Sequence, residues 1–150
     1  MTLQETSNFI ESLKKDTSEK SEKKVYEELL YILSRLKIRE FSQGEINSIE
    51  TELNTLNLKS NPENRTKHFK KSLSKFKKYL KYTFSLTSKG YYTNMGITLG
   101  SGFGVVAGII IGERFEKSLG IALGIGIGML IGLFVGRSMD AKAKSENRML

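Results

Sequence analysis

The sequence has 150 residues, no cysteine, a single histidine and a formal net charge of +8 at pH 7. Without cysteine the chain has no disulfide framework and no cysteine-ligated metal site, and one histidine is too few for a histidine metal cluster or a nucleophile–base pair held by a third group. We therefore expect no cofactor and no enzymatic activity.

Residues 1–60 are expected to form a cytoplasmic helical domain. Apolar residues recur at helical spacing in the segment that begins at Ser21, and Ser42 and Glu45 form a capping-box pattern ahead of a second apolar run. Residues 1–15 allow a further short helix. The sequence thus predicts three or four helices before the apolar region, packed as a small bundle, and a protein partner of unknown identity for residues 1–89.

Residues 61–89 carry nine basic and one acidic side chain and predict a basic amphipathic juxtamembrane helix. Asn61 and Pro62 give a helix-start signal. Five apolar residues share one face: Phe69, Leu73, Phe76, Leu80 and Phe84. Two interpretations stay open and are compatible. The helix lies on an anionic bilayer surface, or it packs its apolar face into a core and leaves a basic face in solvent.

For the first interpretation, the residues expected to meet anionic lipid head groups are Lys70, Lys71, Lys75, Lys77 and Lys78. Nucleic acid is the less favoured partner, because the segment shows no base-stacking platform and no recognition motif.

Two ladders of glycine at every fourth position follow: Gly96, Gly100, Gly104, Gly108 and Gly112, then Gly120, Gly124, Gly128, Gly132 and Gly136. They lie in spans without charge, 90–112 and 118–136, joined by a short polar loop, 113–117. At 1.5 Å per residue the spans would form helices of roughly 35 and 28 Å, close to the ~30 Å hydrocarbon core of a bilayer. The sequence predicts a two-span transmembrane helical hairpin, and the fold class is all-α.

A β-ribbon with a glycine face is the alternative, because every ladder position is even-numbered. Seventeen residues as a strand would extend about 56 Å, whereas membrane strands have about 9–11 residues, so length favours helices. The sequence leaves open whether 63–112 is one helix or breaks near Ser88, Lys89 and Gly90.

Glycine lowers the stability of a helix interior by roughly 1 kcal/mol relative to alanine, but it lets two membrane helices approach closely. We therefore expect the ten ladder glycines to form the helix-packing surface. Gly102 and Gly126 lie outside the ladder, about 160° around each helix from its stripe, counting about 100° per residue. These two positions predict a second small face on which a neighbouring copy could pack, and hence a homo-oligomer. The alternative is that they only relieve crowding near Phe103 and Ile125.

Charge predicts the orientation. Basic residues precede the first span and follow the second, in the charged tail 137–150, while the loop has no net charge. The positive-inside rule then places both termini in the cytoplasm, and the start of the chain lacks a signal-peptide core.

The segment from about Tyr92 to Leu150 resembles glycine-zipper two-span proteins of bacteria, with repeated G-x-x-x-G and a charged tail, GRSMDAKAKSENRML. The resemblance implies a bacterial inner-membrane location and self-association. It supplies no reaction and no catalytic residues.

Our leading hypothesis is a bacterial inner-membrane protein, not an enzyme, whose glycine-zipper hairpin anchors and self-associates a cytoplasmic helical interaction domain. Two alternatives remain. One is a membrane-perturbing or pore-forming effector restrained by its cytoplasmic helices. The other is a membrane-tethered adaptor that binds nucleic acid or protein.

Overall fold

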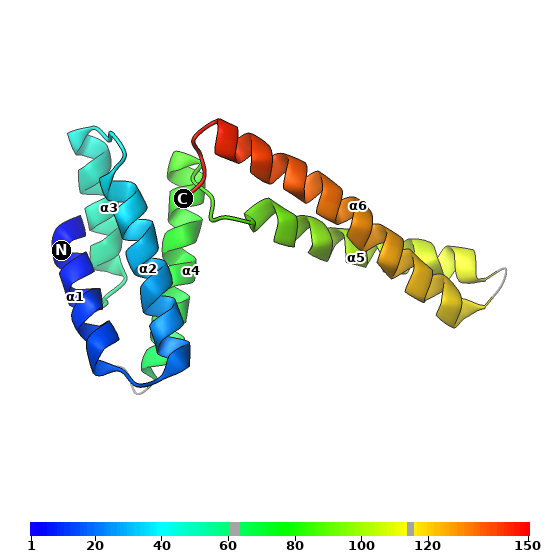
Figure 1. Ribbon diagram of the computed structural model, residues 1–150, viewed down its shortest axis with the longest axis horizontal. Helices are drawn as coiled ribbons and strands as arrows, with labels where there is room; N and C mark the ends of the chain where they lie inside the picture. Colours follow the sequence, from blue (N-terminus) through cyan, green and yellow to red (C-terminus); the bar gives the residue numbers. More distant parts are fainter. Residues whose placement is uncertain (61–63, 114–115) are drawn as a thin grey trace. The chain divides into compact units, whose positions relative to one another are not determined.

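The computed structural model describes residues 1–60, 64–113 and 116–150, and these residues form six α-helices (Figure 1). The expected all-α class is confirmed. The chain divides into a helical unit, Met1–Leu86 with Leu150, and a hairpin unit, Thr87–Met149. This division differs from the four segments expected from the sequence, because the basic helix belongs to the helical unit and most of the tail to the hairpin.

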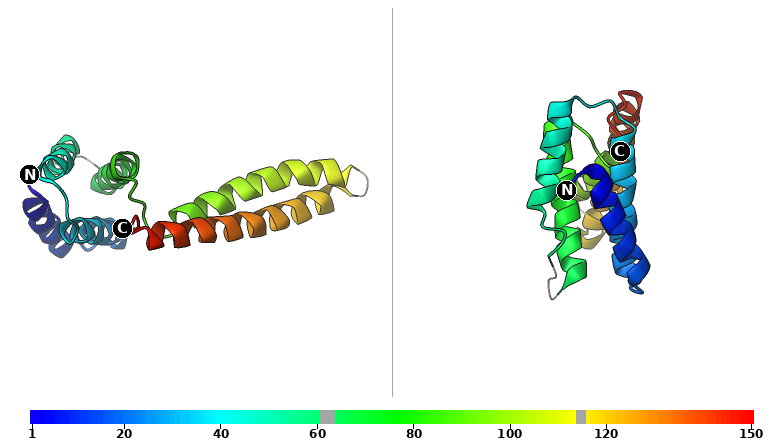
Figure 2. Two further views of the ribbon diagram at one scale, coloured as in Figure 1. Left: turned by 90° about the horizontal axis from the view of Figure 1, so that it is seen from above. Right: turned by 90° about the vertical axis from the view of Figure 1, so that its left-hand side faces the viewer.

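The helical unit contains α1 (Leu3–Asp16), α2 (Lys20–Lys37), α3 (Gln43–Thr55) and α4 (Arg65–Phe84). The four helices lie side by side, as two views show (Figures 1 and 2). The capping box predicted at Ser42 is confirmed: its hydroxyl accepts from the Glu45 N–H, while the Glu45 carboxylate accepts from the Ser42 N–H. Thr2 and Glu5 form a second capping box at α1.

The core of the helical unit includes the apolar face of α4. Phe69, Phe76 and Leu80 are at most 2 % exposed, and the ring of Phe69 meets that of Tyr26 edge-on with centroids 4.9 Å apart. Burying such large side chains is the main term that holds the four helices together. Of the two interpretations of this segment, core packing is therefore the one the structure adopts, and this face of α4 is not available to lipid.

Backbone conformation separates α4 from the first apolar helix. Asn64 caps α4 by accepting from the Lys67 N–H at 2.9 Å, whereas the start predicted at Asn61 lies outside the described residues. Ser85 ends α4 with a left-handed φ of 56°, and Gly90 begins the next helix with a φ of 76°. A left-handed residue at each point turns the chain, so 63–112 is not one continuous helix.

The hairpin unit consists of α5 (Tyr91–Gly112) and α6 (Lys117–Ser145), which lie side by side along their length (Figure 2). Helix α6 extends nine residues beyond Gly136, so much of the expected tail is helical. Asn147, with a φ of 53°, turns the chain after α6, and the Arg148 N–H donates to the Ala143 carbonyl at 2.8 Å.

Both helices of the hairpin unit are long and apolar enough to cross a membrane. Within their most apolar windows, 17 % of residues in α5 and 22 % in α6 are buried. The core helix of a soluble protein buries most of its apolar residues, and these two helices leave most of theirs exposed.

Candidate functional site: the glycine contact of the helical hairpin

The ladder glycines are the contact between α5 and α6. They meet in pairs, Gly96 with Gly132, Gly100 with Gly128, Gly104 with Gly124 and Gly108 with Gly120, while Gly136 meets Tyr92 and Gly112 meets Lys117. A Cβ added at nine of these ten positions would lie closer than 3.0 Å to a backbone atom of the facing helix, and at Gly112 it would lie 3.0 Å from the Lys117 Cα. Any side chain would force the helices apart, so this separation requires glycine at each step.

Three of the four glycine pairs face each other through carbonyl oxygens. At Gly96, Gly100 and Gly104, the nearest atom to an added Cβ is the carbonyl oxygen of the paired glycine, and the reverse holds from α6. A hydrogen occupies that direction in glycine, so each pair forms two reciprocal Cα–H···O contacts. Such contacts contribute about 0.5–1 kcal/mol each and recur where membrane helices approach closely.

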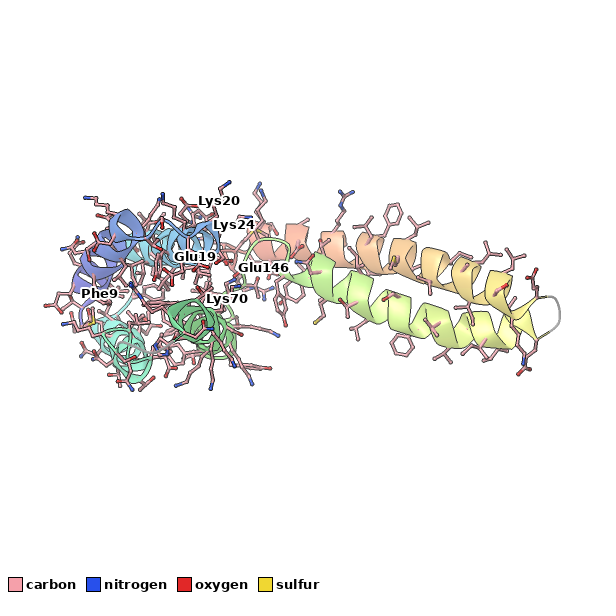
Figure 3. The ribbon with its side chains drawn as sticks, turned by 90° about the horizontal axis from the view of Figure 1, so that it is seen from below. Phe9, Glu19, Lys20, Lys24, Lys70 and Glu146 are labelled. Atoms are coloured by element: carbon pink, nitrogen blue, oxygen red, sulfur yellow. The ribbon has the colours of Figure 1, made fainter. Side chains whose placement is uncertain are left out.

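The outward surface of the hairpin is apolar. Phe103 is 74 % exposed and Phe134 75 %, and in Figure 3 the side chains of α5 and α6 project away from the contact between the helices. One face carries a shallow groove of about 430 Å³, with ladder glycines at its floor and Leu99, Phe103 and Ile131 among its walls. Exposing so many large apolar side chains to water is unfavourable, so this surface suits hydrocarbon or another apolar surface.

Gly102 and Gly126 do not take part in the contact between α5 and α6. Nothing lies within 4 Å of a Cβ added at either position, and both residues are exposed. Gly126 lines a second apolar groove of about 590 Å³ together with Ala122 and Leu130.

Asp140 is a site residue that the sequence reasoning missed. It lies four residues after Gly136, at the next ladder position, and is 9 % exposed. Its carboxylate accepts from the Tyr92 and Thr93 N–H groups, each at 3.1 Å, and from the Thr93 hydroxyl at 2.6 Å. These N–H groups belong to the first turn of α5, where a helix has no internal acceptors, so Asp140 caps α5 from α6. The sequence signal that could have identified Asp140 is its position four residues after Gly136, which continues the spacing of the ladder glycines.

A backbone contact closes the same end of the hairpin. The Thr87 N–H donates to the Arg148 carbonyl at 2.9 Å, and Thr87 and Met149 form an isolated parallel bridge. The Arg148 guanidinium pairs with the Glu146 carboxylate, which raises the pKa of Arg148 through this hydrogen bond. The chain thus enters and leaves the hairpin unit at adjacent points.

Two hydroxyl groups of α5 are satisfied within their own helix. The Thr98 hydroxyl donates to the Asn94 carbonyl and the Ser101 hydroxyl to the Thr98 carbonyl, both at 2.9 Å. This back-bonding is the usual way a hydroxyl is accommodated in an apolar helix surface. These hydroxyls therefore do not offer a polar lining for a pore within one hairpin.

The five lysines expected to meet lipid all lie on α4 of the helical unit. Lys75 pairs with Glu52 at 3.6 Å and Lys77 with Glu28, so these two are engaged by carboxylates of the same unit. Lys70, Lys71 and Lys78 are exposed. Of the five predicted lysines, two are therefore paired with carboxylates of the same unit, and three are exposed without such an ion pair among the residues that the structure describes.

Titratable groups of the described residues do not assemble into an acid–base or metal site. No group of three or more potential metal ligands occurs in residues 1–60, 64–113 and 116–150. Burial, and then the Glu22 carboxylate, raise the pKa of Tyr26, whose hydroxyl donates to Glu22 at 3.4 Å inside the helical unit. Hydrogen bonds from Ser42 lower the pKa of Glu45, a helix cap. Both shifts belong to structural contacts.

Comparisons with known protein families, with curated proteins and with solved structures find no match to this chain.

Proposed function

We propose that this chain is a membrane protein, not an enzyme, in which α5 and α6 cross the bilayer as a glycine-zipper hairpin and anchor the helical unit as an interaction domain. The observation that carries the proposal is the inverted packing of the hairpin. Its glycines face inward and its large apolar side chains face outward, which is unfavourable in water and suits hydrocarbon. The proposed location is the bacterial inner membrane with both termini cytoplasmic, supported by the basic flanks of the hairpin.

Single cysteines test anchoring and orientation, because the chain has none of its own. Ser118→Cys lies at the loop end of α6 and Ser145→Cys at its other end, and both serines are exposed. In spheroplasts, a membrane-impermeant maleimide should label the Ser118→Cys variant and reach the Ser145→Cys variant only after lysis. Recovery of the unmodified chain in the soluble fraction would rule out the anchor, and the reverse labelling would overturn the orientation.

We further propose that copies associate side by side, with α5 of one hairpin against α6 of the next. The pairing of Gly100 with Gly128 and of Gly104 with Gly124 supports this, because it sets Gly102 and Gly126 level with each other on the two helices. Hairpins inserted in the same orientation therefore carry both glycines at one depth in the bilayer. A close contact between Gly102 of one copy and Gly126 of its neighbour needs no vertical shift.

The residues that flank these glycines have complementary sizes. Thr98 and Val106 lie one turn to either side of Gly102, and in the same register they are level with Leu130 and Ala122. A larger residue would thus meet a smaller one on each side of the glycine contact. Such a contact uses two different surfaces of the chain, so repeating it forms a ring if the rotation closes.

Disulfide crosslinking tests the contact. A Gly102→Cys copy and a Gly126→Cys copy carrying different tags should crosslink when expressed together. Leu99→Cys with Ile131→Cys, both in the groove lined by the ladder glycines, is the matched control and should not crosslink. Crosslinking of Gly126→Cys copies to each other, with none between positions 102 and 126, would replace the side-by-side contact by a two-fold dimer.

A further inference from the structure

We propose that the outward face of α4, formed by Lys67, Lys71, Lys78 and Tyr82, binds the head groups of anionic phospholipids without inserting the apolar face of the helix. This inference rests on the proposed membrane anchor and deepens it. It replaces the five lysines expected from the sequence by a different set, selected by the structure.

The helix geometry assigns this face. Lys67, Lys71, Lys78 and Tyr82 are exposed and fall within about 60° of one another around α4, on the side opposite Phe69, Phe76 and Leu80. Lys70, at the edge of this face, is also exposed and lines an open cleft that Glu19 and Glu22 line as well. Because the apolar residues hold the core together, α4 can present only this basic side to a surface while the unit stays folded.

Ion pairing distinguishes the face from the rest of the helix. Lys75 and Lys77 are paired with Glu52 and Glu28. Among the carboxylates of the described residues, none forms an ion pair with Lys67, Lys71 or Lys78. The positive charge of this face is therefore not cancelled by those carboxylates, and a surface of negative charge complements it.

Tyr82 adds an aromatic ring to the basic face. It is 71 % exposed, and its ring centroid lies 5.9 Å from the Lys78 Nζ and 5.2 Å from the Lys81 Nζ. A tyrosine ring combines an apolar body with a polar tip and is favoured at the level of lipid head groups. An exposed tyrosine beside lysines is therefore typical of a protein surface that meets lipid head groups.

Connectivity keeps the face close to the bilayer. Residues 85–90 separate α4 from α5, and six residues span at most about 20 Å even when fully extended. The head groups are therefore present at a high effective concentration, and weak individual contacts suffice. Each lysine near an anionic surface raises the docking equilibrium about fivefold, so three together raise it on the order of 100-fold.

A fluorescent reporter can follow docking in the full-length chain, because the sequence has no tryptophan. The Tyr82→Trp variant is reconstituted into phosphatidylcholine vesicles with or without phosphatidylglycerol, and insertion of the hairpin is checked by flotation. With phosphatidylglycerol, the indole emission should shift to shorter wavelength and become quenchable by brominated lipid, and high salt should reverse both changes. Tyr31→Trp, at another exposed tyrosine of the helical unit, should show neither change.

Two triple variants that lower the net charge equally distinguish an effect of this face from an effect of the protein's net charge. Lys67→Gln, Lys71→Gln and Lys78→Gln together, in the Tyr82→Trp background, should abolish the phosphatidylglycerol-dependent quenching. Lys20→Gln, Lys23→Gln and Lys24→Gln, at exposed positions of α2, should preserve it. Circular dichroism confirms that both variants remain folded.

Failure of the inference is distinguishable from failure of the anchor. Vesicles that float without the protein would overturn the membrane anchor itself. An inserted protein whose indole responds equally to both kinds of vesicle, or is unaffected by the α4 substitutions, overturns the lipid face alone. A response to an RNA oligonucleotide with none to phosphatidylglycerol would assign the face to nucleic acid and also overturn it.

Discussion

Asp140 shows how a single side chain ends a glycine ladder at the point where α5 begins. A further glycine at this position would leave the first-turn N–H groups of Tyr92 and Thr93 without the acceptor that the carboxylate now provides. If α5 crosses a bilayer as proposed, water competes less for these groups, and a missing acceptor is more costly than at an exposed helix end. The residue therefore joins the two helices by charge and hydrogen bonding where backbone contact between glycines stops.

Replacing Asp140 should weaken closure of this end. Asp140→Ala removes three hydrogen bonds to a carboxylate and should lower the free energy of unfolding by about 2–4 kcal/mol, and Asp140→Asn, which keeps one acceptor, should lower it less. The measurement is unfolding of the detergent-solubilised protein by increasing SDS, followed by circular dichroism. Equal stability of the Asp140→Ala variant and the wild type would contradict a capping role.

Tyr26 should make the helical unit sensitive to alkaline pH. Its pKa is raised in the folded state, so the folded chain holds the phenol proton more tightly than the unfolded chain. The stability this contributes is fully present below the unfolded pKa of about 10 and is lost as pH rises through the higher folded pKa. Tyr26→Phe should therefore reduce the loss of stability between pH 9 and 11, as measured by urea unfolding. An identical pH profile for both proteins would mean that the pKa of Tyr26 is the same in the folded and unfolded states.

In the hairpin, ten glycines form the contact between α5 and α6, and two further glycines, Gly102 and Gly126, lie outside this contact. Within the ladder, close approach of the backbones offsets the low helix propensity of glycine. Gly102 and Gly126 have the same low propensity and no such compensation within the hairpin. This contrast allows the contribution of close packing to be measured on one helix.

Alanine at two positions of α5 separates packing from propensity. Gly102→Ala adds a methyl group to open space and should be neutral or stabilise an isolated hairpin by up to about 1 kcal/mol. Gly104→Ala places the same group against the Gly124 carbonyl and should destabilise the helix pair by about 1–3 kcal/mol, because the backbones must separate. SDS unfolding in excess detergent, where copies are apart, compares them. Equal effects would mean that the ladder is not tightly packed.

Much of the architecture at this scale could be predicted from local sequence. Period-four glycine and apolar length predict α5 and α6, and the S-x-x-E pattern predicts the start of α3. The cap made by Asp140 could not be predicted with the same rules, because its partner Tyr92 lies 48 residues away and the register of the two helices must be known first. Similarly, the pattern of α4 is typical of both a core helix and a membrane-surface helix, and only the packing of Phe76 decides between them.

At the scale of the whole molecule, the hairpin unit is inserted into the helical unit rather than appended to it. Leu86 precedes the hairpin and Leu150 follows it, and both are buried in the core of the helical unit, at 4 % and 3 % exposure. The residues between them, 87–149, form the hairpin unit. The core of the helical unit is thus completed by a residue that the sequence pattern assigned to a charged tail.

Leu150 should therefore support the stability of a unit that is otherwise formed by residues 1–86. Leu150→Ala should lower the free energy of unfolding of the helical unit by about 2–3 kcal/mol, since it removes a buried side chain and leaves a cavity. Lys144→Ala, at an exposed position of α6, serves as the control and should change little. Hydrogen exchange of α1–α4 in both variants measures the effect. Unchanged exchange in the Leu150→Ala variant would remove Leu150 from the core.

The adjacent entry and exit of the hairpin have a mechanical consequence. Two segments run together at this end, joined by the Thr87–Arg148 hydrogen bond, and each continues into a buried leucine. Because this bond joins them, neither end of the hairpin unit separates without the other. A pull on either segment is therefore shared by α5 and α6, and the hairpin unit moves as one piece.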